Sequence, residues 1–162
     1  MNSKGALPFE VEGDCMLRVI FFDLGDTLVH VPTRSWLPGA KALLASLKQK
    51  GFRLGIISNT GDLSNRQAIL DILPIDFNLS VFESSWILFS SEIGIEKPKK
   101  EIFEKAVAVA NIQASQCLYC SENIVETLMA QHVGMRSVRV QTAPNSDLAS
   151  LENRLAEFAL LF

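Results

Sequence analysis

Short apolar runs alternate with amphipathic patterns along most of the chain. Runs rich in β-branched and aromatic residues predict strands buried on both faces, at residues 19–22, 52–57, 87–89, 117–120 and 137–140. Between them, apolar residues recur at helical spacing and predict helices at residues 40–50, 62–73, 98–110, 124–133 and 148–161, the second of them capped by Asp62. Residues 29–38 are predicted as a brief loop, and residues 81–86 fit a strand or a loop equally well.

This alternation predicts an α/β fold. We expect a Rossmann-like parallel sheet of about five strands, flanked by helices on both faces and connected by right-handed crossovers. Residues 1–16 are expected to form a flexible leader, and residues 17–162 a single domain. In such a sheet the carboxyl ends of the strands meet at one edge, where ligands bind. Polar residues follow the first, second and fourth predicted strands, so we expect the chemistry at that edge.

Composition narrows the class of protein. The chain has 162 residues, 48% hydrophobic and 20% charged, which is typical of one globular core. Its net charge is −3, and no basic run extends beyond Lys97, Lys99 and Lys100, so a nucleic-acid partner is not expected. No apolar run has the length of a membrane span, and residues 1–9 lack the apolar core of a signal peptide. We therefore expect no membrane partner and a cytoplasmic location.

Two cysteines form a C-x-x-C motif, which is found in redox and zinc sites. Cys117 and Cys120 lie inside the apolar run CLYC, with no second pair and no histidine at ligand spacing. We therefore interpret them as two small buried side chains.

The segment at residues 17–28, LRVIFFDLGDTL, carries the first candidate for chemistry. Its apolar run stops at Asp23, and Gly25 follows two residues later. A carboxylate at the end of a buried strand is unfavourable unless a cleft uses it, and a nearby glycine permits an unusual turn. An ordinary Gly-Asp turn after a strand explains this segment equally well.

Three segments in the same order as a known set of motifs distinguish these interpretations. FFDLGDTL, LGIISNT and SSEIGIEKPKKEIF resemble the motifs of the haloacid dehalogenase-like (HAD) hydrolase superfamily. The resemblance covers roughly residues 17–140, and it is specific because the motifs occur together. It implies a HAD-like fold and phosphoryl transfer through a covalent aspartyl intermediate.

The resemblance also implies a role for each motif residue. Asp23 would be the nucleophile, and Ser58, Asn59 and Lys97 would contact the phosphorylated substrate, while Thr27 would brace the loop. A carboxylate can approach an anionic phosphate only if donors and cations offset the repulsion, which a hydroxyl and an ammonium group at one sheet edge would do. Taken singly, Ser58 fits a residue that caps a turn, and Lys97 fits a solvated lysine.

The first motif departs from the family pattern at the second acid. Gly25 stands where the family usually has a carboxylic acid two residues after the nucleophile, and Asp26 is one residue further on. A positioned general acid contributes roughly 10²–10⁴ in rate, so Asp26, water or the substrate would have to protonate the leaving group. The backbone carbonyl of Gly25 would still be able to bind a metal ion.

The fourth motif departs as well. Alignment on the glycine that follows its helix places the family's glycine-aspartate pair on Ser121 and Glu122, and its second acid on Glu126. The resemblance implies a Mg²⁺ site made by Asp23, Gly25, Glu122 and Glu126. Because Mg²⁺ demands near-ideal octahedral geometry, the longer glutamates predict weak or absent binding. Glu122 and Glu126 also fit solvated acids at the start of a helix.

The spaces between the motifs leave no room for a cap domain. Residues 28–58 and 60–97 are filled by elements of the predicted core, which is typical of capless family members. The resemblance then implies either a macromolecular substrate or a neighbouring subunit that acts as a lid. The second alternative would make the protein an oligomer. We predict a HAD-like phosphatase of modest activity. The alternative is a catalytically impaired binding or regulatory module without turnover.

Overall fold

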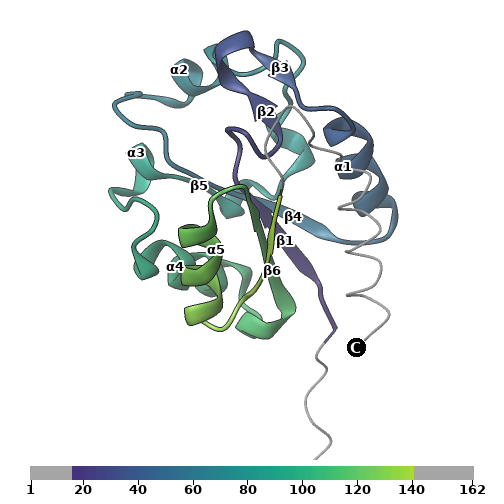
Figure 1. The fold of residues 1–162 in the computed structure, drawn as a ribbon, viewed down its shortest axis with the longest axis vertical. Helices are drawn as coiled ribbons and strands as arrows, with labels where there is room; N and C mark the ends of the chain where they lie inside the picture. The colour runs from purple at the N-terminus through teal and green to yellow at the C-terminus, as the bar shows by residue number, and fades with distance from the viewer. Residues whose placement is uncertain (1–15, 141–162) are drawn as a thin grey trace, which may run out of the picture.

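A parallel sheet of five strands, in the order β5-β4-β1-β6-β7, forms the centre of the computed structural model, which describes residues 16–140 (Figure 1). Its strands are β1 (Val19–Phe22), β4 (Arg53–Ser58), β5 (Ile87–Phe89), β6 (Cys117–Ser121) and β7 (Arg136–Arg139). Each lies within one residue of its predicted bounds at both ends. The predicted α/β architecture is therefore confirmed, and β1 occupies the central position.

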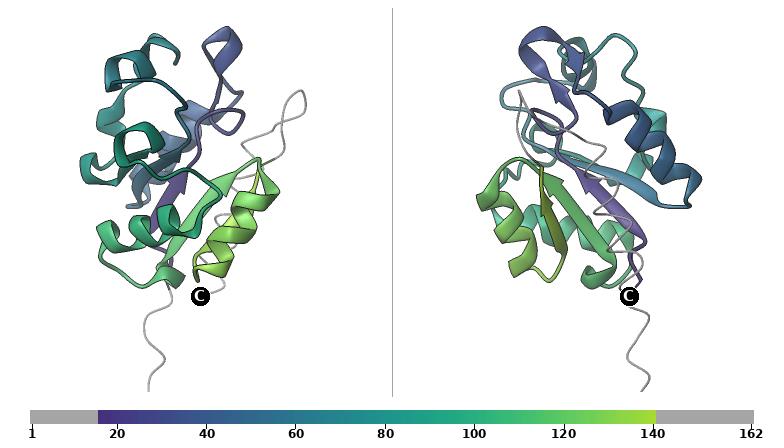
Figure 2. Two further views of the ribbon diagram at one scale, coloured as in Figure 1. Left: turned by 90° about the vertical axis from the view of Figure 1, so that its left-hand side faces the viewer. Right: turned by 45° about the vertical axis from the view of Figure 1, so that its right-hand side comes forward.

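Helices cover both faces of this sheet (Figure 2). They are α1 (Ala40–Gln49), α2 (Arg66–Asp71), α3 (Ser90–Ile93), α4 (Lys100–Ala110) and α5 (Ile124–His132). Apolar residues of α1 and α2 pack on one face, and those of α4 and α5 pack on the other. None of the described helices combines the length and the apolar character needed to cross a membrane. The predicted leader, up to residue 15, and the predicted helix at residues 148–161 lie outside the described residues.

Alternation along β1 explains why its whole apolar run is buried. Ile20 and Phe22 belong to the hydrophobic cluster under α1, whereas Val19 and Phe21 belong to the cluster under α4 and α5. Successive side chains of a strand point to opposite faces, so a strand with helices on both sides is apolar throughout. The strand therefore ends abruptly at the first polar residue, Asp23.

The same alternation settles the interpretation of the two cysteines. Cys117 packs in the cluster under α4 and α5, Cys120 packs in the cluster under α1, and both are buried and form no disulfide within the described residues. Burial raises the pKa of the Cys117 thiol to about 12, because an apolar environment disfavours the thiolate. The two thiols face opposite sides of the sheet, and each packs in a hydrophobic cluster, as the sequence predicted.

Two local predictions need correction, and the alternative left open at residues 81–86 is decided against a strand. Residues 29–38 form a small antiparallel hairpin of β2 (Val29–His30) and β3 (Ser35–Trp36), joined through the 3₁₀ turn η1 (Val31–Thr33), and strands of two residues leave no period in the sequence. Helix α2 begins after Asn65, whose side chain accepts a hydrogen bond from Ala68 N–H at 2.9 Å, and is not capped by Asp62. Residues 81–86 contain the 3₁₀ turn η3 (Ser84–Trp86), which follows η2 (Leu79–Val81).

No separate domain interrupts the described core. The hairpin and α1 occupy the segment between β1 and β4, and α2, η2, η3, β5 and α3 occupy the segment between β4 and Lys97. Within residues 16–140 the protein therefore lacks a cap, as the sequence predicted.

Candidate active site

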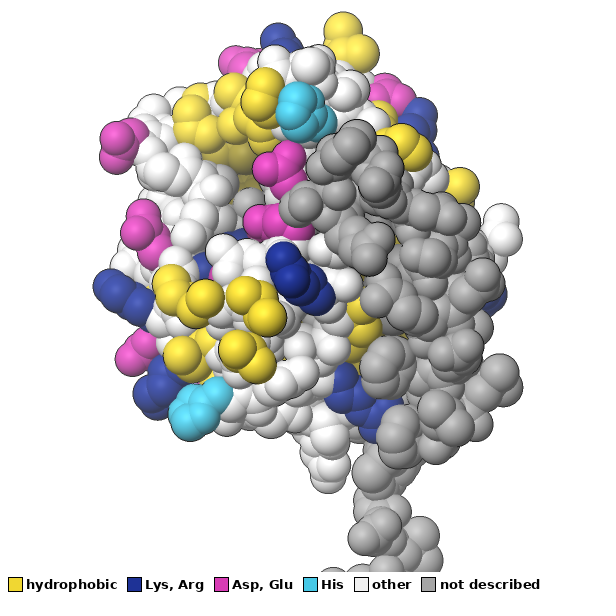
Figure 3. Space-filling view, viewed as in Figure 1, with side chains coloured by type: hydrophobic (Ala, Val, Ile, Leu, Met, Phe, Trp, Pro, Cys, Tyr) yellow, Lys and Arg dark blue, Asp and Glu magenta, His cyan; other side chains and the backbone are white. Residues whose placement is uncertain are grey.

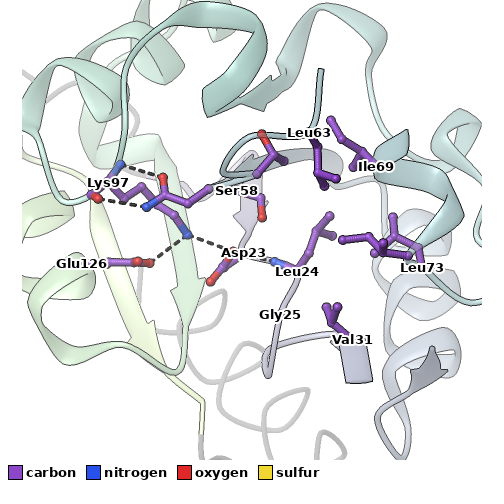
Figure 4. A pocket seen from close by; sticks show the side chains of 13 residues that line it. Asp23, Leu24, Gly25, Val31, Ser58, Leu63, Ile69, Leu73, Lys97 and Glu126 are labelled. Atoms are coloured by element: carbon purple, nitrogen blue, oxygen red, sulfur yellow. Dashed lines mark hydrogen bonds and ion pairs between the residues drawn. The ribbon is translucent and has the colours of Figure 1, made fainter. Parts of the chain in front are cut away.

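A cavity of about 260 Å³ opens at the carboxyl ends of β1 and β4 (Figure 4). In Figure 3, hydrophobic side chains border a hollow that lies to the left of two acidic side chains near the centre of the view. The polar residues that line the cavity are Asp23, Ser58, Asn59, Thr60, Lys97 and Glu126. Six of the predicted site residues therefore line this cavity, at the sheet edge where the topology placed them: Asp23, Gly25, Ser58, Asn59, Lys97 and Glu126.

The Lys97 ammonium group lies at the centre of the polar side. Its Nζ is 2.8 Å from Asp23 Oδ1 and 2.9 Å from Glu126 Oε2, and it donates to the Tyr119 hydroxyl oxygen at 3.0 Å. An ammonium group has three N–H donors, so these contacts use all of them. The Lys97 side chain is only 1% exposed, and burying it is tolerable because both carboxylates lie beside it.

The main chain of Lys97 is fixed by Asn59. Asn59 Nδ2 donates to the carbonyl oxygen of Lys97 at 3.0 Å, and the Lys97 N–H donates to Asn59 Oδ1 at 2.8 Å. The bond from Lys97 to Pro98 is cis. Asn59 follows β4 directly, so this pair of hydrogen bonds ties the end of the strand to the segment that carries the lysine. The amide that we expected to contact the substrate is thus engaged in positioning Lys97.

Asp23 is buried and held by two donors on one oxygen. Besides Lys97, the backbone N–H of Leu24 donates to Asp23 Oδ1 at 2.7 Å. Burial raises the pKa of the Asp23 carboxyl to about 6; Lys97 opposes this rise, and the negative charges of Glu126 and Glu122 add to it. The second oxygen, Oδ2, makes neither of these contacts.

Tyr119 is a member of the site that the sequence analysis missed. Its hydroxyl accepts from Lys97 and donates to Glu126 Oε2 at 2.7 Å, which also accepts from Ser121 Oγ at 3.0 Å. Burial, with the carboxylates of Asp23 and Glu126 nearby, raises the Tyr119 pKa well above its usual value, so the hydroxyl keeps its proton. The sequence did contain one indication of this role: a tyrosine in a buried strand usually has a hydrogen-bond partner for its hydroxyl.

Thr27 connects the loop after β1 to the loop after β6. Its hydroxyl donates to Glu122 Oε2 at 2.8 Å and accepts from the Glu122 N–H at 3.2 Å. Thr27 is fully buried, so these bonds fit the predicted brace. They also occupy the Glu122 carboxylate, which does not line the cavity.

Asp26 is not brought into the cavity either. It is exposed, adopts a left-handed backbone conformation with φ of 53°, and its N–H donates to the Val29 carbonyl oxygen at 2.8 Å. Short polar residues such as aspartate tolerate this conformation in a tight turn. Asp26, considered as a replacement for the missing acid, and Glu122, considered as a metal ligand, are therefore both outside the lining of the cavity.

The donors at the cavity fit a loosely held cation. Within residues 16–140, no group of three or more histidine, cysteine, aspartate or glutamate side chains is placed to hold a metal ion. Asp23, Gly25 and Glu126 do line the cavity and supply oxygen atoms. Mg²⁺ often takes only one or two carboxylates and fills its shell with waters and substrate phosphate oxygens. The residues present therefore suit Mg²⁺ bound together with a phosphate, and not a closed protein cage.

Comparisons with known proteins show the family, and the matched range begins after Asp23. The family model for haloacid dehalogenase-like hydrolases matches residues 33–134, a range that contains Ser58, Lys97 and Glu126. A glyceraldehyde 3-phosphate phosphatase from Pyrococcus abyssi is 32% identical over 103 residues, which cover 63% of this chain and 41% of that protein. A protein of the same name from Methanothermobacter thermautotrophicus is 28% identical over 116 residues, 71% of this chain and 47% of that protein. The chain spans less than half the length of these relatives.

Solved structures share the fold. An uncharacterized protein from Listeria monocytogenes superposes with a TM-score of 0.69 at 23% identity, covering 88% of this chain and 98% of that one. A HAD family enzyme from Bacteroides thetaiotaomicron, in complex with magnesium and inorganic phosphate, has a TM-score of 0.62 at 14% identity and covers 83% of this chain and 98% of that one.

Proposed function

Because the chain belongs to the haloacid dehalogenase-like hydrolases, we propose that it is a phosphatase that hydrolyses phosphate monoesters through an aspartyl-phosphate on Asp23. The observation that carries the proposal is the buried Asp23 carboxylate, 2.8 Å from the Lys97 ammonium group and lining one cavity with Ser58. The name of the relatives, glyceraldehyde 3-phosphate phosphatase, supports an enzyme acting on a phosphorylated substrate over a binding module without turnover.

The proposed reaction has two displacements at phosphorus. Asp23 Oδ2 attacks the phosphorus atom, a new O–P bond forms, and the bond to the ester oxygen breaks with its electron pair leaving on that oxygen. Water then attacks the aspartyl-phosphate, which releases inorganic phosphate and restores the carboxylate. The Lys97 ammonium group and the Leu24 N–H hold Asp23 Oδ1, which fixes the direction of Oδ2. The Ser58 hydroxyl would donate to a phosphoryl oxygen.

Charge at the cavity supports a role for Mg²⁺. Asp23 and Glu126 bring two negative charges against the single positive charge of Lys97, before an anionic phosphate enters. When bound, Mg²⁺ would supply positive charge to the phosphoryl oxygens. Asp23, Glu126 and the Gly25 carbonyl are the groups that would hold it.

Mg²⁺ should bind weakly, because few protein oxygens face the cavity. In isothermal titration calorimetry we expect heats that saturate only at millimolar Mg²⁺, and a lower dissociation constant when inorganic phosphate is present to add ligands. Asp23→Asn should weaken the binding further. A micromolar dissociation constant without phosphate would contradict this prediction.

Phosphate release from a generic aryl phosphate tests the proposed function. With Mg²⁺ present, the chain should release inorganic phosphate, and Ser58→Ala should lower kcat/KM by roughly 10²-fold, because one donor to the developing charge is lost. The melting temperature of Ser58→Ala serves as a control for folding. Release no faster than in buffer alone would refute the proposal.

Two finer predictions stay open. A macromolecular substrate, or a second subunit as a lid, follows from the absence of a cap in the described residues. Phosphate release from short and long substrates, and gel filtration of the active protein, would test them.

A further inference from the structure

Apolar side chains form the side of the cavity that faces away from Lys97 and Glu126. Figure 4 shows Leu24, Val31, Leu63, Ile69 and Leu73 turned toward the same space, on the opposite side of Asp23 from Lys97. With Ile72 these residues form what we call the apolar wall. They come from the loop after β1, the hairpin and the α2 region, so the wall is assembled from separate parts of the chain.

The hairpin that contributes to the wall is fastened in place. Trp36 of β3 stacks on Phe77, with ring centroids 5.0 Å apart and an interplanar angle of 14°. The indole N–H of Trp36 also donates to Asp76 Oδ1 at 2.7 Å. Both partners follow α2, so these contacts join the hairpin to the α2 region. The wall is therefore present before a ligand enters.

Within residues 16–140, the polar side of the cavity offers no carboxylic acid that can give up a proton. Among the described residues that line it, only Asp23 and Glu126 carry carboxyl groups. Asp23 is the proposed nucleophile, and Glu126 Oε2 accepts from Lys97, Tyr119 and Ser121, an arrangement that suits an anion. Gly25, beside the nucleophile, has no side chain.

On the basis of the function proposed above, we propose that the substrates are aryl phosphates, which are phosphate esters with an apolar leaving group that departs without a proton. Asp23 Oδ2 forms the new bond to phosphorus, the ester bond breaks, and its electron pair leaves on the phenolate oxygen, which then takes a proton from water. A phenol has a pKa of about 10, so its anion is a far better leaving group than an alkoxide. Aryl phosphates fit both observations: the ring can pack on the apolar wall, and the phenolate can leave without an acid.

The size and chemistry of the cavity favour one apolar ring beside the phosphoryl group. Sites for drug-sized ligands measure roughly 300–1,000 Å³, so a cavity of about 260 Å³ suits a phosphoryl group with one ring. A polyol phosphate would have to bury hydroxyl groups against the apolar wall without partners, which is unfavourable. An apolar alkyl phosphate would fit the wall, but its alkoxide would need the proton that the site does not supply.

Phenyl phosphate and benzyl phosphate separate the two requirements, because both carry one apolar ring and differ in the leaving oxygen. We expect kcat/KM for phenyl phosphate to exceed that for benzyl phosphate by about 10²–10⁴-fold, the usual contribution of a general acid. A ratio below tenfold would overturn the claim about the missing proton.

Gly25→Asp tests the same claim from the enzyme side, with Gly25→Asn as the matched control. A Cβ atom at Gly25 would meet nothing nearer than Val31 Cγ2 at 3.9 Å, so both side chains fit the backbone. Gly25→Asp should reduce the phenyl-to-benzyl ratio at least tenfold, because its carboxylic acid can protonate the alkoxide. Gly25→Asn has the same shape without that proton and should keep the ratio. Equal ratios in both variants would overturn the proposal.

Leu63→Asn tests the apolar wall. Leu63 is partly exposed at the cavity, and the change should raise KM for phenyl phosphate about tenfold while moving the Ki of inorganic phosphate, which reaches only the polar side, by less. An unchanged KM, or glycerol phosphate used as well as phenyl phosphate, would overturn the apolar part. Failure of the proposed function itself looks different, because no ester would then release phosphate.

Discussion

Asp23→Asn is expected to abolish phosphate release and at the same time to raise the melting temperature. The nucleophile is lost, so kcat should fall by roughly 10⁴–10⁶-fold, as for nucleophile replacements in other enzymes. The pKa of Asp23 is raised to about 6 although Lys97 lies beside it, which means that burial outweighs the ion pair and the anion is unfavourable. A neutral amide removes that penalty, on the order of 1–3 kcal/mol, and should raise the melting temperature by several degrees.

The pH dependence of stability shows why Asp23→Asn should be more stable than the parent at neutral pH. In the unfolded chain the Asp23 carboxyl loses its proton near pH 3.8, whereas in the folded chain it keeps the proton up to about pH 6. Between these values the folded state holds more protons, so the contribution of Asp23 to stability is lost as the pH rises through this window. The stability of Asp23→Asn should not fall in this way between about pH 4 and pH 6, and kcat/KM of the parent should rise through about pH 6. A variant that melts below the parent at pH 7 would contradict the prediction.

Lys97→Met should be strongly destabilising at neutral pH. It leaves the buried carboxylates of Asp23 and Glu126 without their shared cation, and breaking a buried ion pair from one side typically costs about 3–5 kcal/mol. Urea denaturation measures the loss in the free energy of unfolding. Part of the stability should return at pH 5, because protonation of Asp23 removes one of the unpaired charges.

Lys100→Met is the matched control for this variant. Lys100 pairs with Glu104 one turn along α4 at 2.7 Å, but both side chains are about half exposed. Solvent-exposed pairs contribute little to stability, so the control should unfold almost as the parent does. Equal losses in Lys97→Met and Lys100→Met would show that the central ammonium group is not what holds the site together.

Much of the fold, and the main polar residues that line the cavity, could be predicted from the sequence. The run that ends at Asp23 predicts a strand with both faces buried, and parallel topology then places Asp23, Ser58 and Lys97 at one edge. These predictions succeed because they depend on local periodicity and on the order of motifs. The lining of the cavity by Glu126 follows in the same way from its place at the start of α5.

The contacts that complete the site could not be predicted, because they depend on side-chain directions. Tyr119 reads as one more apolar residue of a strand until its hydroxyl meets Lys97 and Glu126. Asn59 looks like a substrate ligand until its amide is seen to bond the main chain of Lys97. Spacing also could not show that Asp26 is exposed and does not line the cavity. The hairpin is too short to leave a pattern, yet it supplies part of the apolar wall.

Trapping the covalent intermediate tests the central claim most directly. Turnover of phenyl phosphate is stopped with acid, the chain is digested, and the peptides are analysed by mass spectrometry. We predict one added phosphoryl group on the peptide that carries Asp23, removed by hydroxylamine and absent from Asp23→Asn. Full turnover with no phosphoryl group on Asp23, or with the group on another residue, would contradict the mechanism.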